Sequence, residues 1–176
     1  MCIRDSYLAI YANLSLESDK IYALIGPSGA GKSTFLNLIS GFSEISSGSI
    51  LWNEQEISDL PPSNRNISIL FQDNNLFPHL SVWRNLALAV SHMPKISNDD
   101  QDKLHSVISE VGIHGLESRK PSQLSGGQQS RVALARVLLQ KNKILLLDEP
   151  FAGIDQRCIR CIKDRSWKNG FPHRKF

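Results

Sequence analysis

The chain has 176 residues, of which 41% are hydrophobic, and it carries a formal net charge of +3. This length supports one compact domain with a hydrophobic core and is too short for two independent domains. The mild charge does not demand nucleic acid as a partner, and no run of about 18 apolar residues is present that could span a bilayer.

The first residues and the cysteines give a second set of exclusions. Residues 1–6 contain no basic stretch followed by an apolar stretch, so we expect no secretory signal. The chain has three cysteines, Cys2, Cys158 and Cys161, an odd number that does not resemble a disulfide framework. Cys158 and Cys161 have C-x-x-C spacing, but no second Cys or His pair lies at zinc-site spacing, which favours reduced thiols. These features predict that the working end of the protein is cytoplasmic.

Short apolar runs alternate with helical patterns along the first and last parts of the chain. The pattern predicts a buried strand over residues 21–25, a helix over 33–39 ending at Gly41, an edge strand and turn over 48–53, a core strand over 67–71, a helix over 126–140 and an apolar strand over 143–148. Fully apolar strands are typical of sheets covered on both faces. The alternation therefore predicts an α/β fold with a mostly parallel sheet.

The middle of the chain has a different, helical character. Ser81 is expected to cap a helix that continues to Val90 and is ended by Pro94. Residues 99–111 form a polar, amphipathic pattern with apolar positions on one face. We therefore expect a helical block, at about residues 73–128, inserted into the α/β fold.

A glycine-rich loop lies between the first predicted strand and the first predicted helix. It fits the pattern G-x-x-x-x-G-K-[ST] at every fixed position. Glycines let the backbone wrap tightly, so several N–H groups and the positive end of the helix face one anion. Lys32 is expected to reach the outer phosphates of ATP, and Ser33 to offer its hydroxyl to Mg²⁺. The predicted ATP-binding residues are Gly26, Pro27, Ser28, Gly29, Ala30, Gly31, Lys32, Ser33 and Thr34.

Polar residues follow two of the predicted strands directly. Asp148 ends the apolar strand, where parallel sheets place ligand groups, and is expected to hold Mg²⁺ directly or through water. Glu149 is the best candidate to orient and activate the attacking water. Gln72 follows the strand at 67–71 and could reach Mg²⁺ or that water. Taken singly, each residue would be an ordinary strand end, so the assignment depends on the phosphate loop.

A third block opens the helix at 126–140 and consists of Leu124, Ser125, Gly126, Gly127 and Gln128. A serine and two glycines before a helix again form an anion site, although an ordinary capped helix would have the same sequence. One nucleotide does not need two such sites from one chain. The economical interpretation is that this block faces an ATP held by another copy.

These blocks, in this order, resemble the ATP-binding subunits of ABC transporters over roughly residues 12–156. Residues 26–34 match Walker A, Gln72 the Q-loop, 124–128 the signature, 144–149 Walker B, and Asp155 the acid of the D-loop. The resemblance implies a P-loop NTPase with a RecA-like core at 1–72 and 129–156, a helical subdomain at 73–128, and an irregular tail at 157–176 that leaves the fold incomplete at the C-terminus. It also implies a head-to-tail homodimer that binds and hydrolyses Mg-ATP.

Residues 61–81 resemble importers served by a periplasmic binding protein, most closely those for thiamine. The resemblance implies that Gln72–Ser81 contacts an integral membrane permease at the cytoplasmic face of the inner membrane, with no nucleic acid as partner. Importers of iron, sulfate, polyamines or sugars remain alternatives, because permease and binding protein carry the substrate's identity. Another class, soluble ABC ATPases of DNA repair or ribosomes, commonly has coiled-coil insertions or tandem cassettes, which are not seen in this sequence.

Three positions depart from the family pattern. Tyr7 or the weaker candidate Tyr11 would have to stack on adenine, and Ser130 replaces a common glutamine on what is expected to be a helix surface. After Asp155 no apolar strand leads to a histidine that could contact the terminal phosphate, and His173 is expected to be a surface residue. A third hypothesis is therefore a truncated module that binds ATP but hydrolyses it poorly.

Overall fold

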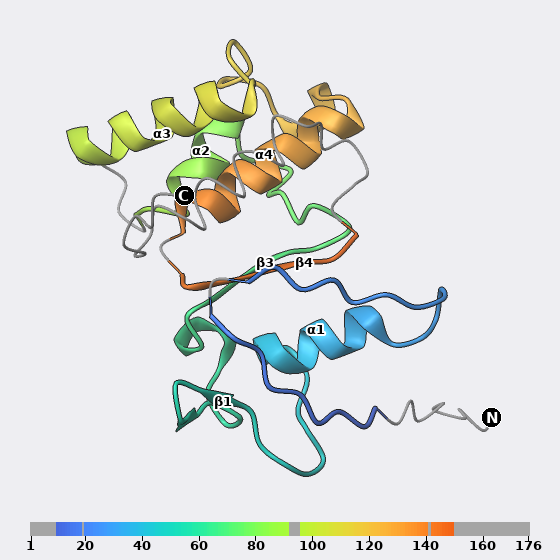
Figure 1. Cartoon of the computed structure of the whole chain (residues 1–176). Coiled ribbons are helices and arrows are strands. Elements are labelled where there is room, and N and C mark those ends of the chain that lie inside the picture. Colours follow the sequence, from blue (N-terminus) through green and yellow to red (C-terminus); the bar gives the residue numbers. More distant parts are fainter. Residues whose placement is uncertain (1–9, 19, 92–95, 141, 150–176) are drawn as a thin grey trace, which may run out of the picture. The chain divides into compact units, whose positions relative to one another are not determined.

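The computed structural model describes residues 10–18, 20–91, 96–140 and 142–149 (Figure 1). The chain divides into two compact units, one up to Arg65 and one from Asn66 onward. Several predicted features, namely Tyr7, Asp155, Cys158, Cys161 and His173, lie outside the described residues. Among the described residues, no helix is long and apolar enough to cross a membrane.

The first unit is built around helix α1, Lys32–Ser40. The helix begins after Gly31 and ends at Gly41, both of which have left-handed backbone angles, with φ of 86° and 83°. Glycine adopts these angles without the steric cost that a side chain would add. The predicted helix after the phosphate loop, and its stop at Gly41, are therefore confirmed.

A short hairpin and a 3₁₀ turn follow α1 in the same unit. Strands β1, Leu51–Trp52, and β2, Gln55–Glu56, pair antiparallel, and the 3₁₀ helix η1 covers Pro62–Asn64. The two residues between the strands, Asn53 and Glu54, have φ of 49° and 65°. Positive φ at both central residues is the requirement of a two-residue type I′ turn. The predicted strand and turn at 48–53 are present, although the strand is shorter than expected.

The predicted buried strand at residues 21–25 is not found. This segment has no strand assignment, and the exposed fractions of Ile21 and Ile25 are 73% and 89%. A strand needs a neighbour to accept its backbone hydrogen bonds, and the described strands of the first unit, β1 and β2, pair with each other. Residues 21–25 are apolar, as predicted, but an apolar composition does not determine which strand would pair with them.

The second unit combines a parallel strand pair with helices. Its elements are β3 (Ile67–Leu70), α2 (Val82–Ala87), α3 (Asn98–Val111), the 3₁₀ helix η2 (Pro121–Gln123), α4 (Gly126–Leu139) and β4 (Ile144–Leu147). The core strand at 67–71, the amphipathic helix at 99–111, the helix at 126–140 and the strand at 143–148 are all confirmed to within one or two residues.

Strands β3 and β4 pair in parallel, from Ile67 beside Ile144 to Leu70 beside Leu147 (Figure 1). The three helices lie on one side of this pair, and their buried faces form one hydrophobic core together with Leu70. Leu145 and Leu147 of β4 pack against that core. Because successive side chains point to opposite faces of a strand, Ile144 and Leu146 lie on the other face, where they are half-buried.

Helix α2 begins as predicted but ends early. The Ser81 side chain accepts a hydrogen bond from the Arg84 backbone N–H, which confirms the predicted cap. The helix stops at Ala87, however, and Ala89 and Val90 continue in turns rather than in the predicted helix to Val90. Val82, Leu86 and Ala87 are buried in the core, and Ala89 and Val90 still pack against it from the turns that follow the helix.

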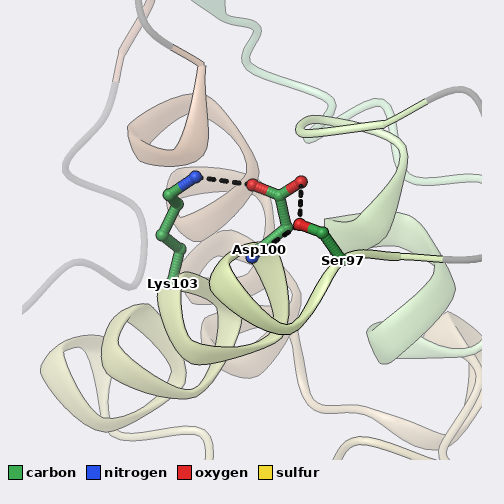
Figure 2. A network of polar contacts seen from close by, with 3 residues as sticks. All are labelled: Ser97, Asp100 and Lys103. Atoms are coloured by element: carbon green, nitrogen blue, oxygen red, sulfur yellow. Dashed lines mark hydrogen bonds and ion pairs between the residues drawn. The ribbon is translucent and has the colours of Figure 1, made fainter.

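Helix α3 carries a polar network at its exposed N-terminus (Figure 2). The Ser97 hydroxyl accepts from the Asp100 backbone N–H at 3.1 Å and donates to the Asp100 carboxylate at 2.9 Å. The Lys103 ammonium lies 2.6 Å from the other oxygen of the same carboxylate. This hydrogen bond raises the pKa of Lys103 above its usual value. The network caps the helix while its opposite face, including Leu104 and Ile108, is fully buried.

Candidate functional site

The predicted phosphate loop is an exposed turn that leads directly into α1. The Ala30 backbone N–H donates to the Pro27 carbonyl at 3.2 Å, and Gly29 has a φ of 79°. No side chain caps the N-terminus of α1, and no acidic residue lies in its first turn. The helix dipole favours an anion at this end of α1, where no acidic side chain opposes it.

Lys32 is folded back over the loop that it follows. Its ammonium donates to the backbone carbonyls of Gly26 at 2.9 Å and of Pro27 at 2.8 Å. These bonds engage two of the three N–H donors of the ammonium. The positive charge is therefore held against the backbone of the loop at Gly26 and Pro27.

The other end of α1 is held by Arg65, a residue that sequence reasoning did not single out. Its guanidinium donates to the carbonyls of Leu38 and Ile39, both at 2.9 Å, to that of Leu60 at 2.7 Å, and to that of Ser58. The side chain is 4% exposed. Burial lowers the pKa of Arg65, and the Asp59 carboxylate opposes that shift. A cation on the last carbonyls of a helix also complements its dipole.

Gly41 makes room for this contact. A Cβ added at Gly41 would lie 2.5 Å from the Arg65 Nε and 2.7 Å from its Cζ. Gly41 is therefore required by its left-handed φ and by the approach of Arg65. The helix that begins at the phosphate loop is fixed at its far end by a buried arginine that has four backbone acceptors.

The second unit brings together two of the predicted catalytic residues. Gln72 and Glu149 follow β3 and β4, whose carboxyl ends meet because the strands are parallel and in register. The Gln72 amide donates to the Glu149 carboxylate at 3.1 Å across 77 positions of sequence. Both side chains are exposed, so the pair is open to solvent.

Glu149 has an unusual backbone conformation. Its φ is 48°, in the left-handed region that non-glycine residues seldom adopt. The neighbouring Asp148 is tied to the sheet by its backbone N–H, which donates to the Leu70 carbonyl at 2.9 Å. The change of backbone direction after Asp148 is what turns the Glu149 carboxylate towards Gln72. Strain at such a position is common where the surrounding structure fixes a functional side chain.

The carboxylates of Asp148 and Glu149 and the amide oxygen of Gln72 are the hard oxygen ligands that Mg²⁺ prefers. Within the described residues there is no group of three or more His, Cys, Asp or Glu side chains that could hold a metal by itself. The phosphate loop and the acidic pair belong to different units, so their joint magnesium site stays a prediction.

The signature block begins α4 through a reciprocal cap. The Ser125 hydroxyl accepts from the Gln128 backbone N–H at 3.3 Å, while the Gln128 side chain accepts from the Ser125 backbone N–H at 2.9 Å. The start of α4 is thus capped in the ordinary way, which was the alternative interpretation of this sequence. Ser125 and Gly126 are nevertheless exposed, and a Cβ added at Gly126 would meet nothing within 4 Å. Leu124 is buried, so the exposed part of the block lies at the start of α4, and the role of the block towards a second ATP stays a prediction.

Ser130 was expected on a helix surface, and this expectation is wrong. The residue is 7% exposed, and its hydroxyl donates to the Gly126 carbonyl one turn earlier at 3.1 Å. Ser130 lies two residues after the signature block, among the buried positions of α4. Such back-bonding lets a serine enter a buried helix face without an unsatisfied hydroxyl. Tyr11, the weaker candidate for adenine stacking, is 95% exposed.

Comparison with known proteins gives one family. The family model described as "ABC transporter" matches residues 11–152 of this chain. The matched span contains the phosphate loop, Gln72, the signature block and the acidic pair.

Three curated relatives are named as thiamine import ATP-binding proteins. The protein of Ruegeria sp. (strain TM1040) is 46% identical over 96% of this chain and 74% of its own length. That of Shigella flexneri is 47% identical over 85% of this chain and 64% of its own length. That of Haemophilus influenzae is 47% identical over 88% and 72%. The chain therefore spans about two thirds to three quarters of the length of these relatives.

Two solved structures of the cassette MJ0796 share the fold. One, described as a dimeric post-hydrolysis state bound to ADP and Pi, is 28% identical, with a TM-score of 0.65 over 81% of this chain and 64% of that one. The other, described as the dimeric structure of a bacterial ABC transporter cassette, is 30% identical, with a TM-score of 0.67 over 79% and 64%. These likenesses confirm the predicted P-loop NTPase fold with a parallel sheet.

Proposed function

Since the chain belongs to the ABC transporter family, we propose that it is the ATP-binding subunit of an importer and hydrolyses ATP to energise uptake. The observation that carries this proposal is the hydrogen bond between Gln72 and Glu149 at the adjoining ends of β3 and β4. This bond supports the proposal because it joins the candidate base Glu149 to Gln72 at the carboxyl ends of parallel strands, where α/β proteins commonly bind ligands.

The chemistry assigns each group one task. The backbone N–H groups of residues 28–34 and the Lys32 ammonium would bind the β- and γ-phosphates, and the Ser33 hydroxyl and Asp148 would hold Mg²⁺. Magnesium, when bound, neutralises the charge that develops on the transferred phosphoryl group. Glu149 accepts a proton from the attacking water, and Gln72 holds the Glu149 carboxylate in position.

The chain acts as a head-to-tail homodimer in this proposal. The exposed Ser125 and Gly126 at the start of α4 would meet the γ-phosphate of an ATP bound by the other copy. Support comes from the two similar cassettes, both of which are described as dimeric. The D-loop residue Asp155 would complete the same interface.

Thiamine is the proposed substrate. Support comes from relatives of Ruegeria, Shigella and Haemophilus, which are 46–47% identical and are named for thiamine import. The partners would be an integral membrane permease, contacted by Gln72–Ser81, and a periplasmic thiamine-binding protein that delivers substrate to it. The chain would then act as a peripheral protein at the cytoplasmic face of the inner membrane.

A second candidate function is ATP binding with poor turnover. The residues from Pro150 onward, which include the predicted D-loop residue Asp155, lie outside the described part of the structure. The two candidates differ in the rate of phosphate release at saturating Mg-ATP, while both require nucleotide binding at the loop.

The nucleotide site is tested by the substitution Lys32→Ala. We expect the affinity for Mg-ATP to fall by at least a hundredfold, because the change removes the charge held against the loop. The measurement is titration with a fluorescent ATP analogue. Lys20→Ala is the matched control, since Lys20 lies in the same unit and pairs with an exposed glutamate. Unchanged affinity in Lys32→Ala would overturn the site assignment.

The substrate is tested by uptake. The chain is assembled in proteoliposomes with the permease and binding protein encoded beside its gene, and labelled thiamine is offered outside with ATP inside. We expect thiamine uptake that stops when Lys32→Ala replaces the parent chain. Uptake of iron, sulfate, a polyamine or a sugar in place of thiamine would contradict the substrate assignment while leaving the ATPase assignment intact.

A further inference from the structure

The segment that follows Gln72 runs over the surface of the second unit and has an irregular backbone. Asn74 and Asn75 are both in left-handed conformations, with φ of 58° and 43°. Phe77 is 43% exposed and lies edge-on to His79, with the ring centroids 6.2 Å apart. A segment without helix or strand hydrogen bonds needs other groups to fix its shape.

The Asn85 side chain makes several of the hydrogen bonds that fix the backbone of this segment. Its side-chain oxygen accepts from the Phe77 backbone N–H at 2.8 Å. Its amide nitrogen donates to the carbonyls of Phe77 at 3.1 Å, Leu80 at 3.2 Å and Ser81 at 3.0 Å. The residue is fully buried on α2. Burying an amide is unfavourable unless it is hydrogen-bonded, and here every polar atom of the side chain is bonded to this one segment.

Arg136 holds the same segment from helix α4. Its guanidinium donates to the Asn75 carbonyl at 2.6 Å, and its Cζ lies 5.6 Å from the centre of the Phe77 ring. Burial lowers the pKa of Arg136, although a guanidinium remains charged at any physiological pH. A cation at this distance from an aromatic face is attracted to it. Arg136 therefore fixes both the backbone at Asn75 and the exposed ring at Phe77.

The helix that carries Arg136 also carries the signature block. Ser125 caps α4, and Arg136 lies in the last turn of that same continuous helix, Gly126–Leu139. Helix α4 and the Arg136 side chain therefore form a continuous connection from the signature end to Asn75 and Phe77. Asn85, on α2, is bonded to the segment independently of α4.

We propose that Asn85 and Arg136 are positioning residues that fix the segment Gln72–Ser81 in the shape that meets the permease, and that Arg136 links this segment to the signature helix. The inference rests on the proposed function, because it presumes that the segment contacts a permease. Neither residue is among those proposed to bind nucleotide. Their substitution should leave ATP binding in place and weaken the association with the permease.

The first measurement is hydrogen exchange of the amides of residues 75–81 in the purified chain. Asn85→Asp preserves shape and one acceptor but sets a carboxylate against three carbonyl oxygens, and Arg136→Met keeps the apolar stem while removing the guanidinium. We expect about tenfold faster exchange over this segment in each variant. Arg136→Lys, which keeps a cation, should restore part of the protection. Asn98→Asp and Arg119→Met make the same changes at exposed positions and should leave the segment unchanged.

The second measurement separates positioning from folding. Affinity for a fluorescent ATP analogue should stay within about twofold of the parent, because the phosphate loop is not touched. Retention on vesicles that contain the permease should fall about tenfold in Asn85→Asp and Arg136→Met.

Unchanged exchange in both variants would overturn the positioning role. Faster exchange with unchanged retention, on vesicles that bind the parent chain, would overturn the link to the permease. If the parent chain itself fails to bind such vesicles, the proposed permease contact is contradicted. The exchange data then still decide whether Asn85 and Arg136 fix the segment.

Discussion

At the scale of single residues, the molecule concentrates backbone strain and buried charge around the ends of a few elements. Glu149 has a φ of 48° and is bonded to Gln72, and Arg65 places a buried guanidinium on the last carbonyls of α1. Both features fix the position of a group that the proposed function uses, namely the candidate base and the helix that begins at the phosphate loop.

The pairing of Gly41 with Arg65 leads to a prediction about stability. Gly41→Ala should lower the free energy of unfolding by about 2–4 kcal/mol, because the methyl group meets a positive φ and also displaces the guanidinium. Urea denaturation measures this loss. Gly48→Ala is the matched control, since Gly48 has a φ of 89° but a Cβ there would meet nothing within 4 Å. The control should lose about 1–2 kcal/mol. Equal losses at the two glycines would contradict the role of Arg65.

Much of the site could be predicted from single residues and their spacing. The phosphate loop, Gln72, Asp148 and Glu149 are recognisable because a small anion-binding loop and polar strand ends are encoded locally. Arg65 and Asn85 were missed. Both side chains bond to backbone groups, namely carbonyls and, for Asn85, one N–H group. Because almost every residue type has these groups, the sequence does not reveal which residues are the partners. A lone Arg before a strand and a lone Asn in a short helix look like ordinary surface residues until burial is known.

At the scale of elements, helices α3 and α4 both begin with a serine cap, but only the cap of α4 belongs to a proposed functional site. Ser97 caps α3 and Ser125 caps α4, each by accepting the backbone N–H three residues later, at 3.1 Å and 3.3 Å. The α3 cap is extended by an ion pair with Lys103 (Figure 2). The α4 cap is followed by two glycines that leave the helix start uncovered. Because both helices have a serine cap but differ in what surrounds it, the effects of removing each serine can be compared directly.

We expect Ser125→Ala and Ser97→Ala each to lower the free energy of unfolding by about 1 kcal/mol, since each removes one side-chain cap. Only Ser125→Ala should also weaken the ATP-dependent association of two chains, because only that hydroxyl is proposed to meet the phosphate of a second copy. Thermal denaturation and sedimentation velocity with Mg-ATP measure the two effects. An equal effect of both substitutions on association would leave Ser125 with a capping role alone.

Elements differ in how far sequence determines them. The helices α3 and α4 were predicted to within one or two residues because each has a serine N-cap followed by a buried apolar stripe. The run at 21–25 was wrongly predicted to be a buried strand, because an apolar composition does not specify which neighbour will accept its hydrogen bonds. Helix α2 was predicted too long, since the first turns contain most of its buried residues and the end depends on packing.

At the scale of the whole molecule, the second unit joins the acidic strand end, the signature helix and the segment after Gln72 in one core. The division expected from the sequence, with a core at 1–72 and 129–156 and a helical subdomain at 73–128, stays a prediction. Within the second unit, helices and strands share their hydrophobic contacts, so motifs far apart in sequence are parts of one packed body.

The substitution Glu149→Gln tests ATP hydrolysis and dimer formation together. It removes the proposed general base while keeping shape and hydrogen-bonding capacity, so ATP should remain bound and uncleaved between two chains. We expect phosphate release to fall at least a hundredfold and a dimer to appear with Mg-ATP in size-exclusion chromatography with light scattering. Glu117→Gln, a half-buried glutamate outside the motifs, is the control. A parent chain that already lacks phosphate release yet forms that dimer would favour the binding-only function.

The unbroken length of α4 has a mechanical consequence. From its cap at Ser125 to Arg136 the helix rises about 16 Å, at ~1.5 Å per residue. If Arg136 acts as a pivot, a tilt of about 10° would carry the signature end through roughly 3 Å, which is about the length of one hydrogen bond. A change of this size decides whether a phosphate at the far end is contacted or released. Helix α4 would then act as a lever that converts a small rotation near Phe77 into gain or loss of a nucleotide contact.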